Sequence, residues 1–299
     1  MFETISMDFP AESSVKDYFA LTKPGVLSLV VFSSIAGMIL APGTIHYIVA
    51  ITSILAVSLG SAAAAAINMW YDRDIDSIMH RTRNRPIVTG KISHENALAF
   101  GLVIGFLSIL IMAVCVNYLA AFLLLSSISF YVFIYTMWLK RSTPQNIVIG
   151  GASGALPPVI GWVSVTGSID IAPIIMFLII FFWTPPHFWA LALSKNEDYK
   201  LAKIPMMPIT HGYHKTKTQM LIYAILTVLS SLVLCIFYPV SIFYFISATV
   251  LGSKFILDAY RLLKDPDSIN SMQLFKFSIL YLFELFGALI MDYYFFSIL

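Results

Sequence analysis

Residues 45–76 read IHYIVAITSILAVSLGSAAAAAINMWYDRDID, a long apolar run that ends abruptly in polar side chains. Between Ile45 and Ile67 the only ionisable residue is His46, and the run is long enough for a helix to cross a bilayer, which takes roughly 20 residues. The stretch therefore predicts a membrane-spanning helix that delivers a polar cluster to one boundary of the membrane.

The polar end of this stretch has the chemistry of a metal and diphosphate site. If the helix continues, Asn68, Asp72 and Asp76 recur every four residues and share one face, whereas Asp74 points elsewhere. Two carboxylates one turn apart repel each other unless a cation lies between them, and hard oxygen ligands beside a phosphorylated substrate suit Mg²⁺. The alternative is a solvated acidic helix end neutralised by Arg73. Three arginines at alternate positions follow within ten residues and favour the site: Arg81, Arg83 and Arg85.

Composition places the whole chain in the membrane. Apolar residues make up 59% of it and charged residues 11%, and its mean hydropathy is +0.85. Soluble domains carry roughly a quarter of charged residues, so the composition excludes a soluble enzyme. Both cysteines fall in apolar runs without a C-x-x-C partner, which indicates neither a disulfide framework nor a zinc site.

The fold class that we predict is all-α: a polytopic membrane protein with nine transmembrane helices around a central cavity. Residues 1–24 would be a cytoplasmic N-terminal segment with a short amphipathic helix around 15–21, and residues 25–299 a single domain. The fifth run contains Pro157-Pro158, which predict a break in the helix. It also contains four glycines, which predict close helix packing: Gly150, Gly151, Gly154 and Gly161. The apolar runs lie at about 25–42, 45–67, 94–115, 118–138, 146–166, 172–193, 217–238, 241–262 and 273–297.

The basic residues predict the orientation of the chain. All eighteen Lys and Arg except Lys254 lie before the first run, after an even-numbered run, or in the adjoining turn. This asymmetry predicts that the N-terminus and the two long connections, 68–93 and 194–216, face the cytoplasm. Because the first residues carry four acids and no long apolar core, they resemble neither a signal nor a transit peptide, and we expect a bacterial cytoplasmic (inner) membrane.

The second long connection, SKNEDYKLAKIPMMP at 194–208, again mixes acids and bases at the end of a helix. It could face the first cluster across a cavity, with Asp198 as an acid for the metal and Lys200 and Lys203 as phosphate contacts. A basic topology determinant with incidental acids is the alternative, and the sequence leaves both open.

Four sequence words resemble the UbiA-type intramembrane prenyltransferases, and among them the enzymes that farnesylate heme b. They are NMWYDRDID at 68–76, RTRNRP at 81–86, TPPHFWALAL at 184–193 and NEDYKLAKIPMMP at 196–208. The resemblance extends from about Leu21 to the last helix and implies a nine-helix bundle whose cavity opens laterally to lipid.

The resemblance also implies the roles of the polar residues. Asn68, Asp72 and Asp76 would hold Mg²⁺ and the diphosphate, and Arg81 and Arg85 would contact phosphate oxygens. The second motif of the family is D-x-x-x-D. Its positions here are Ser194 and Asp198, so Asp198 would be the main acid of that wall, and whether the wall binds a metal stays open.

The activity implied is transfer of the farnesyl group of farnesyl diphosphate to a vinyl group of heme b, with addition of water, to give heme O and diphosphate. Asp72, Asp76 and Asp198 would be catalytic. The implied partners are both substrates, the lipid bilayer and a downstream heme A synthase or oxidase assembly factor, with no nucleic acid. A quinone precursor or another aromatic ring is the alternative acceptor. A secondary transporter is disfavoured because the polar words lie at one face rather than at the midplane.

Ionisable groups inside the membrane are candidates for function. Lys254 could pair with Asp258 one turn away or contact a heme propionate. His187 could contact the heme or form a satisfied interhelical bond. Glu284, in the middle of the last run, should face the cavity or another helix.

Overall fold

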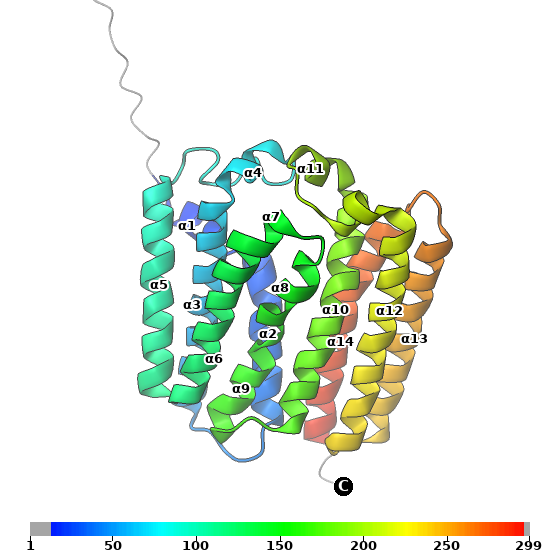
Figure 1. Ribbon diagram of the computed structural model, residues 1–299. Helices are drawn as coiled ribbons and strands as arrows, with labels where there is room; N and C mark the ends of the chain where they lie inside the picture. Colours follow the sequence, from blue (N-terminus) through cyan, green and yellow to red (C-terminus); the bar gives the residue numbers. More distant parts are fainter. Residues whose placement is uncertain (1–12, 296–299) are drawn as a thin grey trace, which may run out of the picture.

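The computed structural model describes residues 13–295, so the first twelve residues of the predicted N-terminal segment and the end of the ninth predicted run lie outside it. The described part contains helices and no strands. The long helices stand side by side as a bundle, with α5 at one edge and α13 at the other (Figure 1). In chain order the helices are α1 Val15–Leu21, α2 Pro24–Leu40, α3 Tyr47–Tyr71, α4 Arg73–Ile78, α5 His94–Cys115, α6 Tyr118–Ser129, the π-helix η1 Phe130–Leu139, α7 Lys140–Ser142, α8 Asn146–Ala155, α9 Pro157–Thr166, α10 Ile171–Ser194, α11 Asn196–Leu201, α12 Met207–Phe237, α13 Ile242–Lys264 and α14 Ser271–Phe295.

The predicted all-helical membrane fold is confirmed, and each of the nine predicted runs has a helical counterpart. Among the described residues, eight helices are long and apolar enough to cross a membrane. The 17-residue α2 completes a ninth span when it is counted with α1, to which it is joined at a bend of 59°. The chain is a multi-pass membrane protein, and the side of the membrane that each end faces stays a prediction.

Two helices extend beyond the predicted apolar runs for identifiable reasons. Helix α3 continues to Tyr71, four residues beyond the apolar run, because its backbone bonding does not depend on hydrophobicity. Helix α12 begins at Met207, ten residues before the predicted run. The first part of α12 is polar, and Pro208 in its first turn favours the start of a helix there. Gly212, with a φ of 77°, breaks the helix and separates this polar part from the apolar part. Hydropathy detects only the apolar part.

Small residues bring the helix backbones into contact. A Cβ atom on Gly161 would lie 1.9 Å from the carbonyl oxygen of Ser34, and one on Gly37 would lie 2.0 Å from that of Pro158. Helices α2 and α9 can therefore cross only with glycine at these positions. The predicted break in the fifth run occurs at Leu156, between α8 and α9. The prediction of close packing was wrong at Gly154, which faces open space.

Both long polar connections lie at the same end of the bundle, where α4 and α11 cover it (Figure 1). They touch one another, since the backbone N–H of Arg81 donates to Oδ2 of Asp198 at 3.4 Å. The predicted arrangement, in which the two acid and base clusters face each other, therefore holds within the described chain.

Candidate active site

The first acidic cluster is positioned by a break in the helix at Asp72. Asp72 lies between α3 and α4 with φ −87° and ψ 7°, in the sparsely populated bridge region that active-site residues often adopt. Its N–H still donates to the carbonyl of Asn68, and the N–H of Asp76 donates to the carbonyl of Asp72. Helical bonding thus continues across the break. Asn68, Asp72 and Asp76 are all buried, whereas the side chain of Asp74 is 59% exposed, as the four-residue spacing predicted.

The inner side chains of this cluster are held by two lysines and one hydroxyl group from three other segments. The Nζ atom of Lys140, at the start of α7, bonds to the Asp72 carboxylate. The Asn68 amide donates to Asp72 at 2.8 Å and to the hydroxyl of Thr136 at 3.1 Å. Lys23, just before α2, donates from Nζ to Oδ1 of Asn68 at 2.6 Å. One buried network therefore ties α3 to η1, α7 and the start of α2.

Asp76 and Asp198 belong to the same polar end. Arg85 bonds through its guanidinium to the buried Asp76 carboxylate. Thr82 donates to the Asp76 carbonyl at 2.9 Å, which fixes the turn that carries the arginine. Asp198 is buried and accepts the Arg81 N–H described above.

The buried neighbour of Asp198 is Tyr199. Burial raises the pKa of the Tyr199 hydroxyl, against the opposing effects of Arg81 and Arg85, so the tyrosine is neutral at ordinary pH and Arg81 can hydrogen-bond to it. The other predicted residues of this connection do not join the cluster. Ser194, Lys200 and Lys203 are exposed, and the side chain of neither lysine makes an ion pair or hydrogen bond with another described residue.

Asp74 lies on the outer side of the cluster, where its carboxylate pairs with Arg141. Arg141 donates to both of its carboxylate oxygens, at 2.7 and 2.8 Å, and lies 4.9 Å from the centre of the Tyr71 ring. This guanidinium bond lowers the pKa of the Asp74 carboxyl, although partial burial opposes it. The pair joins α4 to α7 and keeps Arg141 3.5 Å from Oδ1 of Asp72.

The acidic residues could share a metal with a ligand but do not form a complete cage for one. Within residues 13–295 no three His, Cys, Asp or Glu side chains approach closely enough to hold a metal by themselves. Oδ1 of Asp72 is buried and accepts no hydrogen bond, and Arg141 lies 3.5 Å from it, so this hard oxygen keeps its hydrogen-bonding capacity for a ligand. Mg²⁺ is commonly held by one or two carboxylates together with substrate phosphates. The donor set of Asn68, Asp72 and Asp76 fits such a shared site.

Four members of the site were missed by sequence reasoning: Lys23, Thr136, Lys140 and Arg141. Lys23 and the Lys140-Arg141 pair were interpreted only as topology determinants. Thr136 gave no signal, because it lies in η1, whose π-helical bonding has no simple sequence pattern. Such helices are rare and frequently occur at functional sites.

His187 lies in α10, within a tight interhelical packing. Its Nδ1 atom is 2.7 Å from the hydroxyl of Ser278. Its ring is stacked between Trp183 and Phe275, with centroid distances of 4.3 and 4.5 Å. This placement agrees with the alternative in which His187 makes an interhelical hydrogen bond, and a heme contact stays a prediction.

The two remaining intramembrane candidates lie on the other side of the bundle. Lys254 bonds to Asp258 at 2.5 Å, as the first alternative predicted, and also lines a pocket between α13 and α14. Glu284 is exposed and lines a second pocket between α2, α13 and α14, which contains none of the residues of the acidic cluster, so its contact with the central cavity stays a prediction.

Comparison with known proteins identifies this arrangement. The model of the UbiA prenyltransferase family matches residues 30–282. The chain belongs to this family. The predicted family membership is thereby confirmed.

Relatives within the family match almost the whole chain. A protoheme IX farnesyltransferase from Ehrlichia ruminantium (strain Welgevonden) is 50% identical over 97% of this chain and 98% of its own length. One from Orientia tsutsugamushi (strain Ikeda) is 51% identical over 94% and 90%.

Solved structures share the fold at low identity. A structure of digeranylgeranylglyceryl phosphate synthase superposes with a TM-score of 0.78 at 21% identity, covering 93% of this chain and 98% of that one. A UbiA homologue from Archaeoglobus fulgidus bound to GPP and Mg²⁺ gives a TM-score of 0.67 at 18% identity, covering 91% and 99%.

Proposed function

We propose that this family member transfers the farnesyl group of farnesyl diphosphate to a vinyl group of heme b, with addition of water, to give heme O and diphosphate. The observation that carries the proposal is the buried cluster of Asn68, Asp72 and Asp76 beside Arg85 and Lys140, at the end of a membrane bundle. The choice of substrates is supported by relatives named protoheme IX farnesyltransferase, which match the chain over nearly its full length at about half identity.

The diphosphate would bind between the two acidic walls. We propose that Asn68, Asp72, Asp76 and Asp198 hold Mg²⁺ there; bound, it would act as a Lewis acid that neutralises charge on the departing diphosphate. Arg85 and Lys140, which pair with the carboxylates, can turn to the phosphate oxygens when the diphosphate binds. The remaining proposed phosphate contacts are Lys23, Arg81, Lys200 and Lys203.

The reacting carbon requires protection from water until the acceptor has attacked. When the carbon–oxygen bond to diphosphate breaks, the electron-rich vinyl group attacks the allylic cation. Water then adds to the new cation and loses one proton, which leaves a hydroxyl group. Complete burial of Asp72 and near-complete burial of Asp76 support a site from which bulk water is excluded. The fifteen-carbon tail belongs in apolar surroundings, where each buried CH₂ contributes about 0.8 kcal/mol.

The membrane arrangement and the later partners follow from the same proposal. We propose a bacterial cytoplasmic membrane with the N-terminus and the ends of α4 and α11 in the cytoplasm, where farnesyl diphosphate, a charged molecule, can reach them. Since the product carries a fifteen-carbon farnesyl chain that belongs in the membrane, a downstream heme A synthase or oxidase assembly factor would collect it there.

Product mass tests the proposal directly. Purified protein in lipid nanodiscs is incubated with heme b, farnesyl diphosphate and Mg²⁺, and the porphyrin fraction is analysed by mass spectrometry. The expected product is heme b with one farnesyl group and one hydroxyl group added across a vinyl double bond, absent when Mg²⁺ is chelated. Farnesylation of a quinone precursor in a parallel reaction, with heme b unchanged, would show that the acceptor is an aromatic ring.

A further inference from the structure

His187 on α10 has one ring nitrogen whose bonding is fixed and one that is free. Its Nδ1 atom lies 2.7 Å from Oγ of Ser278, and that hydroxyl lies 2.7 Å from the carbonyl oxygen of Phe275, which precedes it on α14. A hydroxyl group has a single hydrogen, so both bonds form together when Ser278 donates to Phe275 and His187 donates from Nδ1 to Ser278. Assigned in this way, the network leaves the imidazole neutral, with a lone pair on Nε2.

The free nitrogen reaches accessible space. Nε2 makes no hydrogen bond or ion pair with any residue between 13 and 295. His187 is 8% exposed, and its Nε2 is not among the fully buried atoms of the described residues that lack a partner, so part of this exposure is at Nε2. The two faces of the ring are covered by Trp183 and Phe275. A ligand can therefore approach the imidazole at the edge that carries Nε2.

The position of His187 on α10 turns it toward the inside of the bundle. Trp183 donates from its indole N–H to the carbonyl of Ser278 on α14, and Thr184 packs against Gly151 on α8. At about 100° per residue, His187 lies about 40° round the helix from Trp183 and about 60° from Thr184, between these two directions. Helix α2 packs against both α9 and α14, so it bounds this space on the side away from α10.

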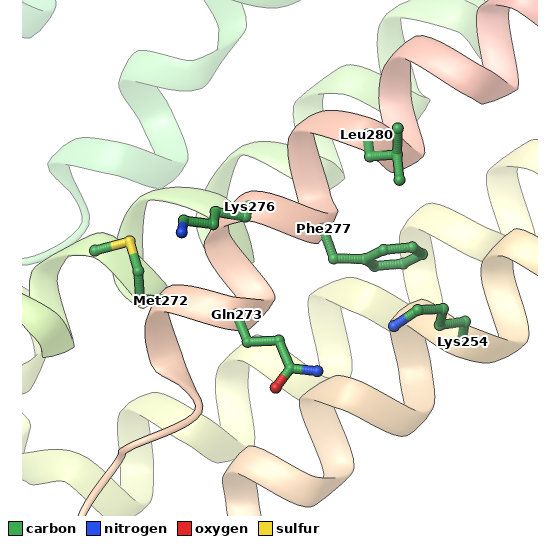
Figure 2. A pocket seen from close by; sticks show the side chains of 6 residues that line it. All are labelled: Lys254, Met272, Gln273, Lys276, Phe277 and Leu280. Atoms are coloured by element: carbon green, nitrogen blue, oxygen red, sulfur yellow. The ribbon is translucent and has the colours of Figure 1, made fainter.

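This inner space is separate from the pocket between α13 and α14. Phe275 and Ser278 face α10, whereas Lys276, on another face of α14, lines that pocket together with Lys254 of α13 (Figure 2). His187 lies seven residues, or about 10 Å, before the end of α10 from which the second polar connection starts. A ligand of Nε2 would therefore lie inside the bundle, beneath the end that carries the acidic cluster.

The surroundings of Nε2 select a metal that brings most of its own ligands. A histidine that ligates a metal ordinarily donates its other ring N–H to a neighbouring group, as His187 does. No group of three His, Cys, Asp or Glu side chains suited to a metal occurs in the part of the chain that the structure describes, and a zinc site takes three or four such ligands. Heme iron already has four nitrogen ligands from its macrocycle and takes an axial histidine in many proteins. The rings of Trp183, Phe188 and Phe275 beside the imidazole offer the macrocycle aromatic contacts.

We propose that Nε2 of His187 is an axial ligand of the iron of heme b, and that Ser278 is a positioning residue that holds the imidazole in the required tautomer. The proposal rests on the proposed function for the identity of the porphyrin, and it concerns how that substrate is oriented. An axial bond fixes the iron and sets the macrocycle across the imidazole, so the vinyl groups at the rim lie on a circle around Nε2. Rotation about the iron–nitrogen bond then decides which vinyl group is nearest the diphosphate site.

Heme b and metal-free protoporphyrin IX, which share macrocycle and side chains, distinguish ligation of the iron from packing against the ring. Each is titrated into the full-length protein in lipid nanodiscs, with empty nanodiscs subtracted, and resonance Raman spectra of the ferrous heme complex report the iron–histidine bond. Wild-type protein should show this band. His187→Gln should lose the band and bind heme b at least about tenfold more weakly, while its affinity for protoporphyrin IX stays within about twofold.

Ser278→Ala leaves His187 in place but removes the acceptor of its Nδ1–H. This variant should bind heme b about tenfold more weakly and shift the iron–histidine band, whereas Ser278→Thr, which keeps a hydroxyl group, should restore both. His214→Gln is the matched control, since His214 is an exposed histidine on α12, and it should change neither quantity. If His187→Gln fails to fold, the two Ser278 variants carry the test.

Several results would overturn the proposal. They are absence of the band in wild-type protein, its persistence in His187→Gln, and an equal loss of affinity for heme b and protoporphyrin IX in that variant. Unchanged heme binding in His187→Gln, with a farnesylated product that lacks the hydroxyl group, would instead make the imidazole a proton acceptor for the added water, and would also overturn it. If wild-type protein shows the band but transfers no farnesyl group to heme b, the ligation stands and the proposed function fails.

Discussion

Replacing Asp72 by asparagine removes one negative charge from the centre of the buried cluster with almost no change in volume. The amide cannot bind Mg²⁺ as a carboxylate does, and it cannot neutralise Lys140. A contact with a charged group contributes about 1.5–3 kcal/mol, which corresponds to a loss of about 10- to 150-fold in kcat/KM for farnesyl diphosphate. The Mg²⁺ concentration needed for half-maximal activity should rise as well.

The stability cost of this substitution should be smaller than for a fully buried pair. Breaking such a pair costs about 3–5 kcal/mol when the remaining charge is trapped. The side chain of Lys140 retains 15% exposure and can turn toward water, so we expect a loss of about 1–2 kcal/mol. Intrinsic fluorescence during thermal unfolding in detergent would measure it, and accumulation in the membrane should be normal.

Asp74→Asn is the matched control, because it makes the same change in charge two residues away. Its partner Arg141 is partly exposed, and a surface ion pair contributes at most about 1 kcal/mol, so kcat/KM should fall less than about fivefold. Initial rates with labelled farnesyl diphosphate compare the two variants. If Asp74→Asn proves as damaging as Asp72→Asn, the direction of the side chain does not matter and the assigned site is wrong.

Arg85→Lys keeps a positive charge but loses the planar guanidinium that can bind a carboxylate or phosphate through two hydrogen bonds, so the rate of farnesyl diphosphate turnover should fall at least about tenfold. Heme affinity, measured by absorbance, should be unchanged, and an equal fall in both quantities would make the arginine structural. Cysteines placed at Lys91 and Lys203 should both react with an impermeant label from the cytoplasmic side, and one at Gly43 from the opposite side; any other pattern contradicts the proposed orientation. Gly161→Ala would force a methyl group against the α2 backbone and should destabilise the bundle by about 1–3 kcal/mol or more, which would be measured as a lower unfolding temperature. Gly154→Ala is the control: residue 154 faces open space, so this change should leave the unfolding temperature unaltered.

Local sequence was sufficient for the direction of the acidic side chains. Asn68, Asp72 and Asp76 face inward and Asp74 faces outward because backbone bonding of helical period persists through the break at Asp72. The break itself was not predicted, since it depends on how α4 turns to cover the end of the bundle. The second connection illustrates the opposite limit: the mixed acid and base pattern of residues 194–208 did not reveal that Asp198 and Tyr199 are the buried ones among its polar residues.

The sequence by itself determined that this chain is an all-helical membrane protein with an acidic cluster at one end, because run length, hydropathy and helical period are properties of neighbouring residues. Only the tertiary structure decided which cation meets which acid. Lys140 reaches Asp72 from 68 positions away, and Arg141, the next residue, bonds to Asp74 instead. That choice depends on the π-helical winding of η1 and on close helix contacts such as the one at Gly161, which fix the rotation and height of neighbouring helices. A glycine in the sequence predicts that two helices approach closely, but it does not say which helix is the neighbour.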